Sequence, residues 1–558
     1  MDVRLKALRD RVEGMRRERL RYEDKWREIA RFVSPGCTAF PEDFEKHGED
    51  DSDDVLNCAP TVALRVLASG MQAGLTSPSR PWFRLTVPDI ALAEYEPVKE
   101  WLGFVQSLMY EVFGKSNFYN VTHQFYGQLA GPGTAAMYIE EYGGAGISCR
   151  CFDVGSYWLA NNRHGVADVF VRLSKMTAAQ MAEMFGEEAC SQEVRRALRY
   201  GSREEPFSVW CAIEPNGEWR ESAMGWRGMR FRCAYWQDGA GTDEFLRIAG
   251  FHEMPVMAAR WDVGDGRVYG RSPSWTALGD CRMLPQLESA CLSGLDRMVD
   301  PPLVAPSALL NKIDTLPGGV TYYDDMGNAP IRGLYDAVQL PIQYIDAKIA
   351  AVTERIKSVF FNDLFMMLTA SNQSGMTARE ITERHEEKLL MLGPVIERTK
   401  FELLDPVIDR VFGILLRAGA LPPPPEELSG VPLQVDYISI LAQAQKMTGL
   451  ASMNELASMT AALVQIGKPE AVDKLNADQF VDEAGRMLGV PPGVVLSDED
   501  VAELRRQREE AARQQQLEAQ AAAAMQQAPA AAKDLADTPL GDGTALDALM
   551  SLSGGNSI

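Results

Sequence analysis

Apolar and polar residues alternate along the first part of the chain with the three-and-four spacing of amphipathic helices. The pattern predicts a first helix over residues 3–33 and further helices near 62–75, 95–114 and 119–130. The polar face of the first helix is rich in arginine, which suits either a helix docked on a domain surface or an arm that touches nucleic acid. Its apolar stripe is interrupted only at Arg19 and consists of Leu5, Leu8, Val12, Met15, Tyr22, Trp26, Ile29 and Val33.

The segment from about 134 to 261 changes to β-branched and aromatic runs in which apolar and polar residues alternate. Glycine-rich turns separate these runs, and the alternation fits half-buried antiparallel strands. One short helix, over residues 177–186, is predicted to interrupt the strands. We therefore predict an α+β fold for the first half of a chain that is mainly helical overall.

Two long helices with apolar stripes are predicted in the middle of the chain. The first covers residues 273–299 and contains Pro285, which should kink it or mark the first turn of its main segment. The second covers residues 341–365 and would form a rod of roughly 38 Å. Such stripes pack against a partner helix, from the same chain or from a neighbour. The segment between them, 300–335, is dense in proline and glycine and too short for a domain.

Beyond the second long helix the pattern breaks and then resumes. A polar stretch at 369–375 precedes a strongly helical segment at 377–419. Pro394 and Pro406 lie inside that segment, so we expect bends rather than a straight rod.

The C-terminal part is predicted to be helical with a flexible end. A short strand at 431–437 is followed by helices over 438–486 and by a charged helix over 497–518. Low-complexity sequence dominates after that helix, and we expect disorder from about residue 530.

Length, net charge and hydropathy limit the number of structural units and the kinds of partner that the chain can have. A chain of 558 residues predicts about three to four structural units, because single cores stop growing near 250 to 300 residues. The net charge of -22 argues against a protein that grips nucleic acid through its phosphates, since Lys and Arg drive such binding. The N-terminus lacks the apolar core of a signal peptide, and no uncharged apolar run of 18 residues occurs, so we expect no membrane anchor.

The cysteines are scattered and predict reduced thiols rather than a disulfide framework. There are nine of them, none in a Cys-x-x-Cys spacing. Cys149 and Cys151 lie two apart, on one face of a predicted strand, and in principle could hold a metal. The chain has only five histidines and none is near this pair in sequence, so we expect no metal site.

Enzymatic motifs are weak. The sequence lacks the phosphate-binding loop, the dinucleotide-binding glycine pattern, the nucleophile elbow and the zinc-protease helix. Asp89 with Glu96 and Lys99 approaches a metal-dependent nuclease signature, but the Glu and Lys are three apart instead of two. His385, among glutamates, fits the solvated face of a helix better than an acid-base cluster. We expect a protein that is not an enzyme and has no cofactor, with a packaging nuclease as the enzymatic alternative.

Several short stretches occur in an order that is specific as a set. They are Trp26 with RFVSPG (31–36), TSPSRPWFRL (76–85), VYGRSPSWTAL (268–278), MVDPPLVAP (298–306), LPGGVTYY (316–323) and MTAREITERHEE (376–387). Over about residues 1–445 the chain thereby resembles the head-to-tail connector, or portal, proteins of short-tailed bacteriophages. Another head-tail structural component of the virion is the alternative within the same class.

The resemblance implies a portal fold with named parts. These would be a wing at 1–272, a stem helix at 273–299, a clip at 300–340, a second stem helix at 341–365, a tunnel loop at 366–376, a tunnel helix returning to the wing at 377–437, a helical crown at 438–529 and a tail at 530–558.

The resemblance also implies a function. Subunits would form a ring, a dodecamer in this family, at one capsid vertex, through which double-stranded DNA is packaged and ejected. Implied partners are terminase, a head-tail adaptor, and capsid and scaffolding proteins. The protein would belong to the virion and, during assembly, to the host cytoplasm. An acidic wall that repels the duplex would ease sliding of DNA.

Candidate contact residues follow from these positions. Lys348 and Arg355 lie seven apart on nearly one helical face and could form a sparse basic ring in the channel, or a salt bridge to a neighbouring stem. Asn372 and Gln373 of the tunnel loop are the neutral side chains expected nearest to DNA. Clip residues expected to contact partners are Ile313, Tyr322, Tyr323, Asp324, Asp325 and Asn328.

Overall fold

The computed structural model comprises two compact units, Met1–Thr448 and Gly449–Ile558. Among the described helices, none is both long and apolar enough to span a membrane. The described residues are 3–35, 40, 56–89, 92–93, 95–238, 244–299, 303–304, 332–333, 342–369, 391–428, 430–438, 456–463, 475–488, 501–517, 519, 539–540 and 543–544.

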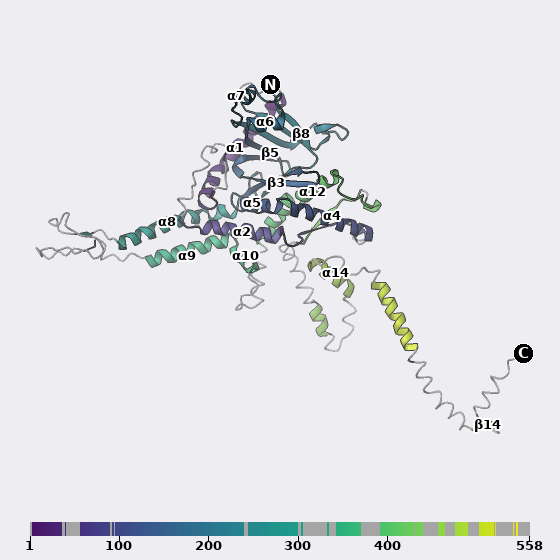
Figure 1. Cartoon of the computed structure of the whole chain (residues 1–558). Coiled ribbons are helices and arrows are strands. Elements are labelled where there is room, and N and C mark those ends of the chain that lie inside the picture. The colour runs from purple at the N-terminus through teal and green to yellow at the C-terminus, as the bar shows by residue number, and fades with distance from the viewer. Residues whose placement is uncertain are drawn as a thin grey trace. The chain divides into compact units, whose positions relative to one another are not determined.

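Helices packed on a small antiparallel sheet form the centre of the first unit (Figure 1). The sheet has three strands in the order β3-β2-β9, and helix α5 packs against both α2 and β2. Pro60 lies in the first turn of α2, where its missing N–H costs no hydrogen bond. The elements are α2 (Ala59–Leu75), α4 (Glu96–Lys115), α5 (Phe118–Ala130), β2 (Thr134–Tyr142), β3 (Gly146–Phe152) and β9 (Val256–Arg260).

A second, five-stranded antiparallel sheet has the order β4-β5-β6-β7-β8. Two short helices stand between β5 and β6, although the sequence pattern predicted only one. Thr177 and Gln180 close a capping box at the start of the first helix, and Ser191 caps the second. The elements are β4 (Tyr157–Asn161), β5 (Ala167–Thr177), α6 (Ala178–Phe185), α7 (Gln192–Tyr200), β6 (Pro206–Pro215), β7 (Phe231–Gln237) and β8 (Arg247–Phe251).

Helix α1 (Val3–Phe32) is docked on this sheet, which decides between the two interpretations of its arginine-rich face. Its apolar stripe packs against three tryptophans of the sheet, and Arg19, which interrupts the stripe, is itself only 2% exposed. Arg19 donates hydrogen bonds to Glu23 at 2.7 Å and to the carbonyl of Tyr157 at 2.9 Å. Its guanidinium also lies 4.0 Å from the ring centroid of Trp158. The polar interruption is therefore a buried docking contact.

Helices α8 (Pro273–Val299) and α9 (Ile342–Val359) lie side by side and extend away from the sheets as an arm (Figure 1). Helix α8 covers the predicted range and runs through Pro285 without ending. Most of the segment between the two helices lies outside the described residues. Within it, β10 (Leu303–Val304) and β11 (Arg332–Gly333) form an antiparallel pair.

The second long helix differs from the prediction. A continuous helix was expected over 341–365, but α9 ends at Val359 and a separate helix, α10 (Asn362–Thr369), follows. Phe361 between them has a φ of 55°, a left-handed conformation that stops an α-helix. Residues 366–369, which were assigned to the predicted tunnel loop, belong to α10, and the rest of that predicted loop lies outside the described residues.

A long helical segment then returns the chain to the sheets. Helix 391–399 continues into a π-helical stretch, Lys400–Leu404, and into α12 (Asp405–Arg417). The irregular turn comes just before Pro406, where a bend was predicted. Strand β12 (Gln434–Tyr437) pairs antiparallel with β1 (Phe83–Thr86), so residues far apart in sequence close the unit.

The second unit is described only in part. It contains helices at 456–463 and 501–517, helix α14 (Ala477–Leu488), and a short antiparallel pair, β13 (Pro539–Leu540) with β14 (Gly543–Thr544). Arg505 forms an ion pair with Asp478 of α14 at 2.6 Å. The pair β13–β14 falls in the segment that was predicted to be disordered.

Candidate assembly surface and its anchoring contacts

The arm is an antiparallel helix pair held together by polar and apolar contacts. Arg355 of α9 donates two hydrogen bonds to the carboxylate of Asp280 of α8, at 2.7 and 3.2 Å. Further out, the thiol of Cys291 donates to Asp346 at 3.5 Å. Asp280 lies nearer the start of α8 and Arg355 near the end of α9, whereas Cys291 lies further along α8 and Asp346 near the start of α9. The two contacts therefore fix the register of the antiparallel helices.

The inner half of the arm is buried within its own chain. Val352 and Ile356 of α9 are 0% exposed and belong to the main core, and α9 also packs on α2. Arg282 of α8 pairs with Glu28 of α1 at 2.9 Å. Part of the apolar stripe of α9 is therefore buried within its own chain. Only the remaining apolar surface of the arm is left for another chain to cover.

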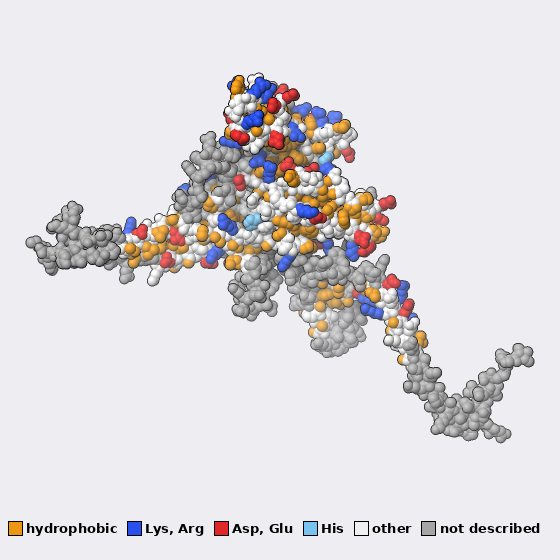
Figure 2. All heavy atoms as spheres, viewed as in Figure 1, with side chains coloured by type: hydrophobic (Ala, Val, Ile, Leu, Met, Phe, Trp, Pro, Cys, Tyr) orange, Lys and Arg blue, Asp and Glu red, His pale blue; other side chains and the backbone are white. Residues whose placement is uncertain are grey.

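The outer half of α8 remains exposed and apolar. Figure 2 shows hydrophobic side chains along the arm formed by α8 and α9. Leu292, Leu295, Met298 and Val299 are 51%, 41%, 58% and 85% exposed, and Tyr344 of α9 is 74% exposed. We call these five residues the arm patch. Contiguous exposed apolar surface of this kind is typical of protein-protein contact sites.

The two basic residues that were proposed to line a channel, Lys348 and Arg355, differ in their contacts. Arg355 is engaged by Asp280 within the same subunit, and this ion pair raises its pKa above the ordinary value. Lys348 is exposed on α9, without an ion-pair partner among the described residues. Asn372 and Gln373 lie outside the described residues, as do the clip candidates Ile313, Tyr322, Tyr323, Asp324, Asp325 and Asn328.

Helix α10 is seated on α2 at a position where only glycine fits. An added Cβ at Gly70 would lie 2.2 Å from the ring of Phe365. Phe365 is 4% exposed and belongs to the main core. The absence of a side chain at Gly70 thus lets α10 approach α2 closely, directly after the break at Phe361.

Two stretches that carry the family resemblance meet at one loop. Trp26 and Trp275 both donate their indole N–H to the carbonyl of Pro132, at 3.2 and 2.9 Å. Gly133 has a φ of 98°, and an added Cβ there would lie 2.8 Å from the carbonyl oxygen of Gly270. The motifs around Trp26 and Gly270 therefore serve to fix α1 and α8 to the start of β2.

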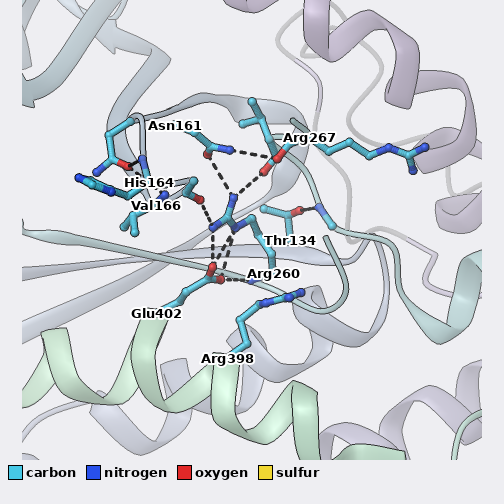
Figure 3. Close-up of polar contacts among 12 residues, drawn as sticks. Thr134, Asn161, His164, Val166, Arg260, Arg267, Arg398 and Glu402 are labelled. Atoms are coloured by element: carbon cyan, nitrogen blue, oxygen red, sulfur yellow. Dashed lines mark hydrogen bonds and ion pairs between the residues drawn. The ribbon is translucent and has the colours of Figure 1, made fainter. Parts of the chain in front are cut away.

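A buried arginine anchors the returning helix to the three-stranded sheet (Figure 3). Arg260 of β9 pairs with Glu402 in the π-helical stretch, and their side chains are 4% and 8% exposed. The guanidinium also donates to Asn161 at 3.1 Å and to the carbonyl of Gly165 at 2.8 Å. This network could not be predicted from the sequence, because one arginine at a strand end and one glutamate in a helix have no local signature.

A second charge network ties α12 to the sheets. Glu253 accepts hydrogen bonds from Arg410 at 2.9 Å and from Arg417 at 2.6 Å, and Arg417 also contacts Glu141 at 3.2 Å. Burial alone raises the pKa of Glu253, but the hydrogen bonds from Arg417 and Arg410 bring it below the ordinary value. Glu253 is therefore held ionised by the helix that it anchors.

In the part of the chain that the structure describes, the candidate chemical sites are not brought together. Among the described residues, no group of three or more His, Cys, Asp or Glu is placed to hold a metal. Cys149 is buried and free, and burial raises its pKa to about 12. Glu96 and Lys99 of the nuclease-like pattern lie on helix α4 and face each other at 4.0 Å instead of sharing a strand.

Comparisons with known proteins agree with the resemblance. The model of the family described as bacteriophage head to tail connecting protein matches residues 5–496. The chain is 38% identical over 543 residues to the portal protein of Salmonella phage epsilon15, covering 97% of both chains. It belongs to the head to tail connecting protein family. The predicted α+β, mainly helical fold and the portal function are thereby confirmed.

Other relatives extend the family. A probable portal protein of Bordetella phage BPP-1 is 38% identical over 507 residues, covering 90% of this chain and 91% of that one. The portal protein of Enterobacteria phage T3 is 24% identical over 444 residues, with 76% of each chain covered. A solved structure of the virion of a native gene transfer agent particle aligns over 78% of this chain with a TM-score of 0.35 and 11% identity. The family assignment rests on the sequence matches.

Proposed function

We propose that copies of this connector family member assemble into a closed ring, a dodecamer, that forms the channel for double-stranded DNA at one capsid vertex. In this proposal the subunit has no catalytic role, and terminase supplies the motor. A head-tail adaptor replaces terminase after packaging, while capsid and scaffolding proteins surround the ring. Assembly takes place in the host cytoplasm, and the ring remains in the virion.

The arm patch supports the ring. Leu292, Leu295 and Met298 project from one region of α8 that its own chain leaves uncovered. Because these side chains are already about half-buried, covering the rest of each contributes roughly half of the about 1.5 to 3 kcal/mol for burying a fully exposed apolar side chain. A closed ring can cover the patch of every subunit without leaving an unpaired edge. Because the inner half of the arm is already buried, the ring needs to cover only the outer half.

The charge of the chain supports a channel that does not hold DNA tightly. A net charge of -22 per subunit, repeated around a ring, is unfavourable for stable phosphate contacts. Translocation would have to break each Lys-phosphate contact at every step, so few free cations favour sliding. The pairing of Arg355 with Asp280 fits this requirement, because the carboxylate offsets the charge of one basic group on the arm.

The ring can be tested with the purified chain by electron microscopy and light scattering. We expect discrete rings with a central hole of roughly duplex width. Leu295→Asp should shift the population toward smaller species, because it places a charge in the arm patch. Leu20→Asp is the matched control, since Leu20 is 60% exposed on α1 outside that patch. Monomers or dimers at every concentration of the unmodified chain would contradict the proposal.

The clip assignment needs its own test. We propose that residues 313–328, which lie outside the described part of the chain, contact terminase and then the adaptor. Deletion of 307–328 should leave rings measurable by light scattering but abolish adaptor binding. Unchanged adaptor binding would show that the contact lies elsewhere.

The absence of catalysis is also open to direct measurement. A packaging nuclease would degrade DNA when incubated with magnesium, whereas a passive channel leaves the DNA intact. Intact linear duplex after prolonged incubation with the purified rings supports the non-enzymatic role. Cleavage that disappears on Asp89→Asn would favour the nuclease.

A further inference from the structure

Two thiols lie side by side on the five-stranded sheet. Cys211 of β6 and Cys233 of β7 have their sulfur atoms 3.6 Å apart. In the strand register Cys211 is opposite Tyr235 and Cys233 is opposite Ile213, so the cysteines are diagonal neighbours on the same sheet face. Both are free, Cys233 is 0% exposed, and Cys211 is partly exposed.

The surroundings distinguish the two sulfurs chemically. Arg172 of β5 is directly opposite Cys211 in the register, so one row across three strands holds a guanidinium, a thiol and the Tyr235 hydroxyl. The hydrogen bond with Cys233 lowers the pKa of Cys211, and although burial raises that pKa, Tyr235 and Arg172 lower it further. The hydrogen bond with Cys211 and burial both raise the pKa of Cys233.

We propose that Cys211 and Cys233 are an oxidisable pair that a hydroperoxide converts into a disulfide joining β6 to β7. Cys211 is the attacking thiolate, since its residue is the less buried of the two and the Arg172 guanidinium lies opposite it in the strand register. Cys233 is the resolving thiol, because it lies next to the sulfur that becomes oxidised.

The reaction balances in two steps. The Cys211 thiolate attacks one oxygen of hydrogen peroxide, an S–O bond forms, the O–O bond breaks, and the leaving hydroxide takes up a proton to become water. The sulfur of Cys233 then attacks the resulting sulfenic acid, the S–S bond forms, the S–O bond breaks, and a second water leaves with the Cys233 proton. Two thiols are oxidised and one peroxide is reduced.

Geometry allows the second step with small movements. A disulfide needs the sulfurs about 2.05 Å apart, so the observed separation of 3.6 Å must shorten by about 1.5 Å. Diagonal neighbours in an antiparallel pair have Cα atoms about 7 to 8 Å apart, so a small approach of β6 to β7 must accompany the side-chain rotations. The bond would close the segment between β6 and β7, including the ordered turn where Asn216 donates to the carbonyls of Trp226 and Met229 at 3.0 and 2.9 Å.

The timing of oxidation rests on the proposed function, whereas the reaction itself does not. A reducing cytoplasm keeps thiols free, and virion surfaces permit disulfides. The subunit would thus assemble with a reduced pair and acquire the bond after particle release.

Peptide mapping tests the pair in the full-length purified protein. The chain is treated with hydrogen peroxide, remaining thiols are blocked with N-ethylmaleimide, and the protein is digested with trypsin without reductant. Arg220, Arg227, Arg230 and Arg232 lie between the cysteines, so trypsin separates them unless a disulfide joins their peptides. We expect a joined peptide two hydrogen atoms lighter than the sum of its reduced parts.

Variants and a melting experiment complete the test. Cys211→Ser and Cys233→Ser should abolish the joined peptide, whereas Cys58→Ser, which removes an exposed thiol, should retain it. Oxidation of the unmodified chain should raise its melting temperature by a few degrees, and dithiothreitol should reverse the rise. This second measurement does not depend on the folding of the serine variants. Peroxide that oxidises Cys58 but leaves Cys211 and Cys233 unlinked would overturn the proposal, whatever the oligomeric state of the protein.

Discussion

Arg260 and Glu402 form a buried ion pair that spans 142 residues of sequence. The Glu402 carboxylate accepts hydrogen bonds from the Arg260 backbone N–H at 2.9 Å and from the guanidinium. Both the backbone and the side chain of the strand end are therefore bound to the π-helical stretch. Both side chains are shielded from water. Their contact connects the helix that returns from the arm to the three-stranded sheet, and its removal leaves a charge without compensation.

Glu402→Ala should therefore lower the free energy of unfolding by about 3 to 5 kcal/mol, because the Arg260 guanidinium stays buried and unpaired. Denaturant unfolding followed by circular dichroism measures this loss. Glu397→Ala is the matched control in the same helical segment. Glu397 pairs with Lys400 at 2.7 Å but is 64% exposed, so its loss should cost less than about 1 kcal/mol. Equal losses in the two variants would show that burial does not govern the contact.

The seat of α10 gives a steric prediction. Gly70→Ala should destabilise the protein by about 1 to 3 kcal/mol, because the new methyl group meets the ring of Phe365 and α10 must move. Gly14→Ala, in the exposed part of α1, has nothing within 4 Å and should stabilise the protein by up to about 1 kcal/mol. Thermal melts of the two variants should shift in opposite directions. A stabilised Gly70→Ala variant would mean that α10 is not held against α2.

Long, regular elements could be predicted from the sequence. Helix α8 has the range expected from its apolar stripe, and α1 docks through the stripe that was identified. Regular periodicity persists over many turns and records which face is buried. The break at Phe361 was missed, because an aromatic residue in a left-handed conformation has no sequence signal like that of glycine or proline.

Long-range polar contacts were not predictable by the same reasoning. Arg19 was noted only as an interruption, although it is a buried docking residue. Arg355 was weighed as a channel residue or as a partner of a neighbouring subunit, and the structure pairs it with Asp280 of its own chain. Periodicity reports which face is apolar, but the partner of a buried charge depends on tertiary packing.

The stability of the protein should fall in acid partly through Glu253. The pKa of this carboxyl in the folded state lies below its ordinary value of 4.5, so its pairing stabilises the fold above that pH. The contribution is lost as the pH falls from 4.5 through the lowered folded-state pKa. Glu253→Gln should reduce stability at neutral pH and flatten the acid limb of a stability-pH profile. Glu221→Gln, at an exposed position, should leave that limb unchanged. An unaltered slope in Glu253→Gln would contradict the assignment.

Lys348 and Arg355 provide a matched pair for testing how the arm meets DNA. Both were proposed to form a sparse basic ring, but only Lys348 lacks an ion-pair partner among the described residues. The carboxylate of Asp280 offsets the charge of the Arg355 guanidinium through two hydrogen bonds, which weakens its attraction for a passing phosphate. The charge of the Lys348 ammonium is not offset in this way. Lys348→Gln should therefore change the rate of DNA packaging and the salt dependence of that rate, and Arg355→Gln should change neither. Because the Arg355 pair is exposed to solvent, its loss should also have little effect on the stability of the fold. Packaging assays with rings of each variant at low and high salt measure the difference, and equal effects of the two substitutions would show that the intramolecular ion pair does not remove Arg355 from the channel.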